Sequence, residues 1–185
     1  IPSSLSVAVF NETEYGLDML LHKAFRYRLH MEADQEALAM KTAGCRRHVY
    51  NVCLEQRSIW GRSHKIGAVH QINQLPELKE HLPFLKEVPS HCLQQAVRDL
   101  DRAYAAFFEG RSDYPTPKRK GRNDSFRFPD PKQFHVGDAW IKLPKFGFVE
   151  WVKHRDLQGT PKSVTVTKRS SGWPGGSRRG PRGAV

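Results

Sequence analysis

The chain has 185 residues, which is enough for one or two domains. Hydrophobic residues make up 38% of it and charged residues 26%, and no stretch approaches the ~18 consecutive apolar residues of a membrane-spanning helix, so the composition excludes a membrane protein and a low-complexity chain. Its 30 Lys and Arg residues against 19 Asp and Glu residues give a net charge of +11, which indicates a polyanionic partner, nucleic acid before a membrane surface.

The first 18 residues differ in charge from the rest of the chain. They carry three acidic residues and no Lys or Arg, and the first Met is Met19. We therefore expect Met19 to be the native start and residues 1–18 to be a poorly packed extension. From Lys23 to Leu29, apolar and basic residues alternate with a period of two, which predicts a half-buried strand with a basic outer face within residues 19–30.

Helical periodicity dominates residues 31–112. Asp34 is the expected N-cap of a first helix, whose apolar positions are Leu38, Cys45, Val49, Val52 and Cys53. A shorter helix is predicted near Ile66–Leu75, ending before Pro76. The strongest pattern runs from Pro89 to Gly110, where apolar residues recur at helical spacing at Leu93, Ala96, Val97, Leu100, Ala103, Tyr104, Phe107 and Phe108.

The pattern changes after residue 112. Residues 113–124 combine two prolines and a glycine with four basic residues, which predicts a basic linker. A period of two then predicts strands at Ser125–Phe128, Ala139–Leu143, Gly147–Lys153 and Ser163–Lys168, so that residues 125–173 would form a small barrel or curled sheet. No period survives in residues 174–185, where we expect a disordered tail.

Cysteine usage and the N-terminal sequence indicate a reducing compartment. The three cysteines form no C-x-x-C pair, so neither a disulfide framework nor a zinc knuckle is expected, and Cys45 and Cys53 are predicted to be buried core thiols. No basic segment precedes the apolar residues at the N-terminus, so it does not resemble a signal peptide. We expect a cytoplasmic, nucleoid-associated protein.

The sequence carries a basic surface and no catalytic motif. It has no G-x-S-x-G, Walker A or H-E-x-x-H motif, and no carboxylate cluster that resembles a two-metal nuclease site. Basic residues beside Phe126 and Phe128 suit phosphate contacts and base stacking, although a solvated surface on a basic protein is the alternative. The candidate nucleic-acid-binding cations are Lys118, Arg119, Lys120, Arg122 and Arg127 around the linker, and Lys142, Lys145 and Lys153 in the later strands.

Several blocks of the sequence occur in the order and spacing of one family. They are KAFRYRL, GCRRHVYNVCLEQR, LPFLKEVPSHCLQQAVRDLDRAYAAFFEGR, YPTPKRKGRNDSFRFP and IKLPKFGFVEW. Over residues 19–173 they resemble the N-terminal half of the TnpB (OrfB) proteins of insertion sequences, which are RNA-guided DNA nucleases ancestral to type V CRISPR effectors.

The resemblance implies an α+β fold. The strand at residues 19–30 and the strands at 125–173 would form a small wedge or OB-like β-barrel, with a helix-turn-helix-like recognition domain at 31–112 inserted between them. It also implies that this half binds target DNA and a guide-like RNA, with Ser90 and Gln94 as candidates for reading a short DNA motif. Glutamine suits this role independently, because its amide can pair bidentately with adenine.

The chain departs from the family at both ends. Residues 1–18 have no family counterpart, and after Trp173 the segment PGGSRRGPRGAV stands where the family shows another strand. The RuvC-like nuclease that follows the barrel in family members is absent from the sequence. We expect a truncated protein with a frameshifted tail, without catalysis and without a cofactor, since Mg²⁺ and Zn²⁺ would belong to the missing half. Two alternatives stay open: a fragment of a complete metal-dependent RNA-guided DNA endonuclease, and a decaying element whose product binds nothing specific.

Overall fold

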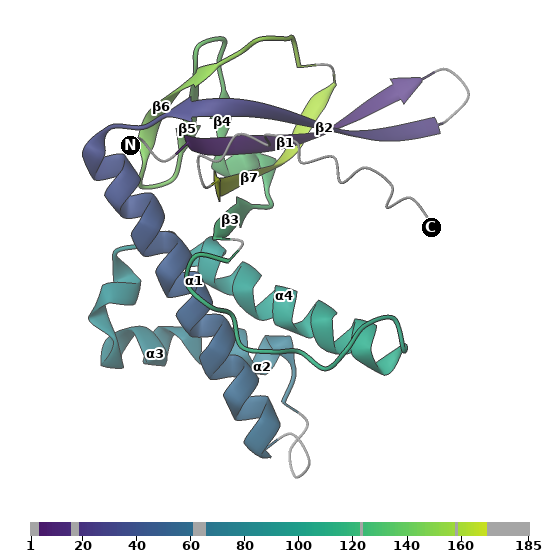
Figure 1. Cartoon of the computed structure of the whole chain (residues 1–185), viewed down its shortest axis with the longest axis vertical. Coiled ribbons are helices and arrows are strands. Elements are labelled where there is room, and N and C mark those ends of the chain that lie inside the picture. Colours follow the sequence, from purple (N-terminus) through teal and green to yellow (C-terminus); the bar gives the residue numbers. More distant parts are fainter. Residues whose placement is uncertain (1–3, 16–18, 61–65, 123, 158, 170–185) are drawn as a thin grey trace, which may run out of the picture.

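The computed structural model describes residues 4–15, 19–60, 66–122, 124–157 and 159–169 (Figure 1). Its helices are α1 (Ala33–Trp60), α2 (Ala68–Asn73), α3 (Leu75–His81) and α4 (Ser90–Phe108), with short 3-10 helices η1 (Pro83–Lys86) and η2 (Pro131–Gln133). Its strands are β1 (Ser4–Tyr15), β2 (Met19–His30), β3 (Ser125–Phe128), β4 (His135–Val136), β5 (Trp140–Leu143), β6 (Gly147–Val152) and β7 (Thr160–Arg169). The predicted tail at 174–185 lies outside the described residues.

The strands form one antiparallel sheet that curls into a half-barrel. Their order is β3-β7-β1-β2-β6-β5-β4, and each neighbouring pair is antiparallel. In Figure 1 the sheet occupies one end of the molecule and the helices extend from it, with α1 leading directly out of β2. Because all four α-helices lie between β2 and β3 in the chain, the molecule agrees with the predicted α+β class.

Strand β1 contradicts the expectation that residues 1–18 pack poorly. Its backbone pairs with β2 from Ser6 to Tyr15 and with β7 from Ser4 to Glu12, so both of its edges are hydrogen-bonded inside the sheet. The strand at residues 19–30 is consequently the second strand of the sheet and not the first. The charge reversal at Met19 misled the prediction, because net charge carries no information about backbone pairing.

Strand β2 confirms the predicted alternation. Phe25, Tyr27 and Leu29 are buried, whereas Arg26 and Arg28 are exposed. The buried side chains face the inside of the curl and the arginines face outward, as a side-chain period of two requires. The predicted strands after residue 124 are also present as β3, β5, β6 and β7, and the two-residue strand β4 was not predicted.

The helices differ from the prediction mainly at their ends. Asp34 lies in the first turn of α1, which begins at Ala33, and is not its N-cap. The predicted helix at Ile66–Leu75 is two helices, because α2 ends at Asn73 and α3 continues through Pro76. Proline lacks an N–H that the first turn of a helix leaves unpaired in any case, so Pro76 starts a helix here instead of ending one.

Helix α4 confirms the strongest sequence pattern except at its C-terminal end. Leu93, Val97 and Leu100 are fully buried, and Gly110 adopts a left-handed φ of 69° just after the helix, the conformation of a helix C-cap. Phe108, predicted to be part of the buried stripe, is 78% exposed. The centre of its ring lies 6.1 Å from that of Tyr104 and 5.4 Å from that of Phe107.

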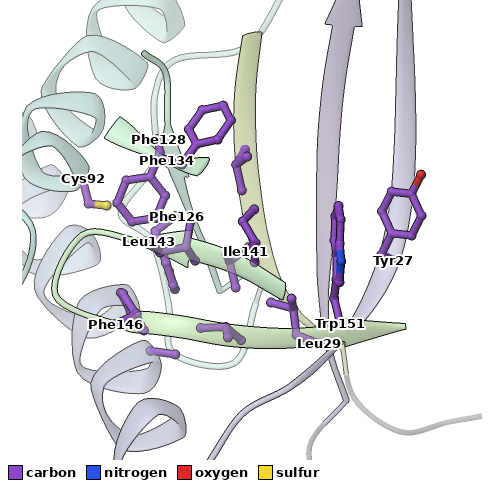
Figure 2. Close-up of a cluster of buried hydrophobic side chains, with 14 of the residues drawn as sticks. Tyr27, Leu29, Cys92, Phe126, Phe128, Phe134, Ile141, Leu143, Phe146 and Trp151 are labelled. Carbon is purple, nitrogen blue, oxygen red and sulfur yellow. The ribbon is translucent and has the colours of Figure 1, made fainter. Parts of the chain in front are cut away.

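Two hydrophobic clusters stabilise the chain. One fills the curl of the sheet and the other lies between the helices. Figure 2 shows the first, in which Cys92 of α4 reaches the rings of β3 and so joins the helices to the sheet. Burial raises the pKa of Cys92 to about 12 and that of Cys53 to about 11, so both are structural thiols. Among the described residues, no helix has the length and apolar character needed to cross a bilayer.

Candidate nucleic-acid interface

The predicted binding residues lie in four places. Arg119, Lys120 and Arg122 occupy a turn in the segment between α4 and β3, and Lys118 and Arg127 flank that turn. Ser90 and Gln94 lie in the first turns of α4, and Lys145 of the β5–β6 turn lies near Lys79, the partner of Ser90. Lys142 and Lys153 lie on β5 and just after β6. The sequence therefore names these candidates, and the fold divides them among separate elements.

The turn that carries Arg119, Lys120 and Arg122 is held in place from both sides. Asn51 of α1 clamps the backbone of Lys118: its side-chain amide donates to the Lys118 carbonyl at 3.0 Å and accepts the Lys118 N–H at 2.8 Å. On the other side, Arg47 pairs with Asp124 at 3.0 Å.

The turn itself is closed by a local contact. Asp124 accepts the N–H of Gly121 at 3.0 Å, and Gly121 has a φ of 79°, a left-handed conformation that favours glycine. Arg119, Lys120 and Arg122 are all exposed. We call these three residues the cationic turn. Its backbone is anchored, while its charges face solvent.

Lys118 and Arg127 have structural roles that the sequence did not predict. The ammonium of Lys118 lies 4.4 Å from the centre of the Tyr50 ring, and burial, together with the neighbouring Arg46, lowers its pKa. Arg127 donates to the amide oxygen of Gln95 at 2.8 Å, and burial likewise lowers its pKa. Both cations are therefore partly buried against protein groups and less accessible to a phosphate than an exposed lysine or arginine.

A carboxylate on α4 connects three arginines. Asp99 pairs with Arg46 of α1 and with Arg102 one turn along its own helix, and Arg127 of β3 approaches it at 3.7 Å. Burial alone would raise the pKa of Asp99, but Arg46 and Arg102 lower it below its usual value. We call this set the Asp99 hub. It joins α1, α4 and β3, and it was not predicted.

The start of α4 brings together residues that are far apart in the sequence. Lys79 of α3 donates to the hydroxyl of Ser90 at 2.7 Å, and burial and the nearby Lys145 lower its pKa. Lys145 in turn donates to the backbone carbonyl of Lys86. Gln94 is half-buried, and its side-chain amide forms no hydrogen bond with another described residue. Lys79 is thus a cation of this site that sequence reasoning missed.

The last two predicted cations lie apart from these groups. Lys153 pairs with Asp138 at 2.9 Å and with Asp156 at 3.2 Å, so two carboxylates offset its charge and raise its pKa. Lys142 is exposed on the outer face of the sheet, 5.2 Å from the centre of the Phe148 ring. Within the described part of the chain, no three His, Cys, Asp or Glu side chains come together in a way that could hold a metal ion.

Comparison with known proteins identifies the family. Residues 19–65 match the HTH_OrfB_IS605 helix-turn-helix domain, and the described part of that span contains β2 and the single helix α1. The chain is 32% identical over 158 residues to InsQ of Escherichia coli K12, a candidate RNA-guided DNA endonuclease, covering 82% of this chain and 39% of InsQ. A candidate RNA-guided DNA endonuclease of Streptomyces pristinaespiralis is 33% identical over 157 residues, covering 81% of this chain and 39% of the relative.

The chain therefore spans about two fifths of the length of these relatives. The matched domain and both relatives belong to the same kind of protein that the sequence blocks resemble in their order and spacing. Over the part that it shares with them, the chain belongs to the OrfB/TnpB type of insertion-sequence proteins.

Proposed function

We propose that this chain is a nucleic-acid-binding part of an OrfB/TnpB protein, which holds target DNA, a guide-like RNA or both, and does not itself cut DNA. The observation that carries the proposal is the cationic turn, whose three exposed charges stand on a backbone anchored by Asn51 and Asp124. A rigid turn loses less conformational entropy when phosphates bind than a mobile loop would. The helix-turn-helix family match and the names of the relatives support nucleic acid as the ligand.

The start of α4 is assigned a different task within this proposal. Ser90, Lys79 and Lys145 offer one hydroxyl and two ammonium groups to a phosphate, and the amide of Gln94 has no partner among the described residues. An amide can discriminate bases, whereas cations on phosphates position the nucleic acid without reading its sequence. We therefore assign base discrimination to Gln94.

Binding should depend on the cationic turn in a salt-sensitive way. We expect the triple variant Arg119→Ala, Lys120→Ala, Arg122→Ala to weaken duplex DNA and RNA binding for all sequences. The slope of log affinity against log salt should become shallower by up to about 3 units, because fewer counterions are released on binding when phosphate contacts are lost. Gln94→Ala should keep this slope and lose about 1–3 kcal/mol of discrimination at a base that it reads. Fluorescence anisotropy over a salt series measures both effects.

The matched control removes three lysines that already pair with carboxylates. Lys41, Lys86 and Lys153 pair with Glu87, Glu80 and Asp138 respectively, so Lys41→Ala, Lys86→Ala, Lys153→Ala removes the same formal charge. We expect it to change the slope by less than about 1 unit. Equal effects of the two triple variants would show that binding depends on net charge alone and not on the cationic turn. If the cationic-turn variant binds like the wild type at both low and high salt, the proposal is contradicted.

Metal-dependent cleavage is the alternative function, favoured by the names of the relatives. We expect no Mg²⁺-dependent cleavage of DNA by this chain, with or without RNA, because the described residues contain no metal-holding group and a two-metal mechanism requires carboxylates within a few ångströms of one another. Incubation of the purified chain with labelled duplex and Mg²⁺ measures this. Cleavage that disappears when one acid within residues 19–173 is replaced would establish the alternative.

A further inference from the structure

A groove lies between the start of α1 and the outer face of β5 and β6. It has a volume of about 770 Å³, and its lining includes His30, Glu32, Gln35, Trp140, Phe148 and Glu150. Trp140, Phe148 and Glu150 point away from the hydrophobic cluster of the half-barrel, because the alternate residues of the same strands, Ile141 and Val149, are buried in it. Met31 and Trp151, which also line the groove, pack against or belong to that cluster. None of the predicted cations lines the groove, although Lys142 is the cross-strand neighbour of its Phe148, so the groove is distinct from the cationic turn and the start of α4.

Two aromatic rings are displayed side by side at this groove. Trp140 is 38% exposed and Phe148 is 59% exposed, and their ring centres are 4.8 Å apart with the planes at 84°. The ring of Trp140 lies against the backbone of Gly137, where an added Cβ would come within 2.6 Å of the indole. Exposed apolar rings cost hydration free energy, so a pair with fixed placement is typical of a surface that stacks against a planar ligand.

The rings are flanked by a cation on one side and by carboxylates on the other. Lys142 is the direct cross-strand neighbour of Phe148, and Glu150 that of Trp140. The carboxylates of Glu32 and Glu150 form no ion pair and no hydrogen bond with another described residue. Gln35, by contrast, is fixed, because its amide donates to the carbonyls of Phe146 and Phe148 at 3.0 and 2.9 Å. Glu32 and Glu150 therefore each offer an acceptor group without a partner among the described residues.

We propose that this groove binds an unpaired guanine of single-stranded RNA, an inference that rests on the proposed nucleic-acid binding and assigns it a second site. The base would stack on Trp140 and Phe148 while Lys142 contacts an adjacent phosphate. The carboxylate of Glu150 would accept from N1–H and N2–H of guanine, the one common base with two adjacent donors on its pairing edge. The second carboxylate, Glu32, would accept from the ribose 2′-hydroxyl, a donor that DNA lacks.

The charges on the groove select this occupant. Two carboxylates with unused acceptor capacity disfavour a phosphate or an acceptor-rich base edge such as that of uracil, and favour a ligand that presents donors. Aromatic rings favour a flat π-system, and nucleobases stack on such rings with little cost in side-chain ordering. In RNA, unpaired bases are displayed in loops, bulges and ends where a surface can reach them. Aromatic rings beside carboxylates can also bind a methylated lysine of a peptide, and the experiment distinguishes this ligand from guanine.

The experiment measures binding of the full chain to a short oligouridine with a single central guanosine. Anisotropy should show tighter binding than for the same oligonucleotide with inosine, which lacks the N2 amine, or with deoxyguanosine at that position. Tryptophan emission should be quenched on binding, and Trp140→Phe should remove that quenching. Phe148→Ala and Trp140→Ala should each weaken the guanosine complex by about 10- to 100-fold. Glu150→Gln should abolish the difference between guanosine and inosine, about tenfold.

Control variants separate this site from the surface proposed above. Val152→Ala, on the same outer face, should leave guanosine selectivity unchanged, and the cationic-turn triple variant should lower affinity while keeping selectivity. Gly137→Ala displaces the Trp140 ring and should reproduce Trp140→Ala in an otherwise folded protein. Retained duplex binding without any preference for guanosine would overturn this site alone, whereas loss of binding to every nucleic acid would overturn the proposed function. Quenching of Trp140 by a trimethyl-lysine peptide and not by the guanosine oligonucleotide would assign the groove to a cation and overturn the proposal.

Discussion

Deleting residues 1–18 should remove most of the stability of the half-barrel. Strand β1 lies between β2 and β7 and pairs with both, so its removal leaves a row of unpaired backbone groups on each neighbour and disconnects β7 and β3 from the rest of the sheet. Small domains are stable by only about 5–15 kcal/mol, and we expect a loss of at least about 5 kcal/mol, well beyond an ordinary substitution. Urea unfolding followed by circular dichroism measures this loss.

A proline substitution tests the same pairing without shortening the chain. The backbone at Val7 is paired with Tyr27 on one side and Val166 on the other, so Val7→Pro removes a ladder hydrogen bond in the interior of a sheet, where proline is rarely found. Thr116→Pro, at an exposed position in the irregular segment after α4, is the control and should change stability little. If the deletion leaves the urea midpoint unchanged, the expectation drawn from the sequence is right and the pairing of β1 contributes nothing.

Replacing Asp99 by Ala should destabilise the protein by about 2–4 kcal/mol, because three arginines would lose their shared counter-ion at a partly buried junction. Asp101, two positions along the same helix, is the matched control. It pairs with Arg57 at 2.9 Å and is 49% exposed, so Asp101→Ala should cost less than about 1 kcal/mol. Chemical denaturation of the two variants measures the difference, and equal costs would show that the Asp99 hub does not hold α1, α4 and β3 together.

The Asp99 hub also predicts a dependence of stability on pH. The folded-state pKa of Asp99 is lowered, so the stabilisation is present above the pKa of an unfolded aspartate, about 3.9. It is lost as the pH falls through the lower folded-state value. The free energy of unfolding of the wild type should therefore fall with acidification in this range, and Asp99→Asn should show a smaller fall. A wild type and an Asp99→Asn variant with parallel acid profiles would contradict the assignment.

The family and the order of elements could be predicted because their signals are local. The alternation at Phe25, Tyr27 and Leu29 and the stripe from Leu93 to Leu100 depend only on neighbours along the chain, and each pattern needs one buried face to be stable. Strand β1 was not predicted, although Leu5, Val7 and Val9 alternate along it, because the charge of residues 1–18 carries no information about the backbone hydrogen bonds with distant strands that hold it.

The sequence by itself determined the helical and strand periods, the excess of basic residues and the membership of the OrfB/TnpB type. Only the tertiary structure decided which cations are free. Lys118 lies on Tyr50 and Lys153 between two carboxylates, whereas the cationic turn faces solvent. The approach of Lys79 to Ser90 and of Lys145 to Lys79, and that of Arg46 and Arg127 to Asp99, likewise follow from the packing of separate elements. The physical reason is range: periodicity is set by adjacent residues, whereas desolvation and Coulomb energy depend on which segments the fold brings within a few ångströms.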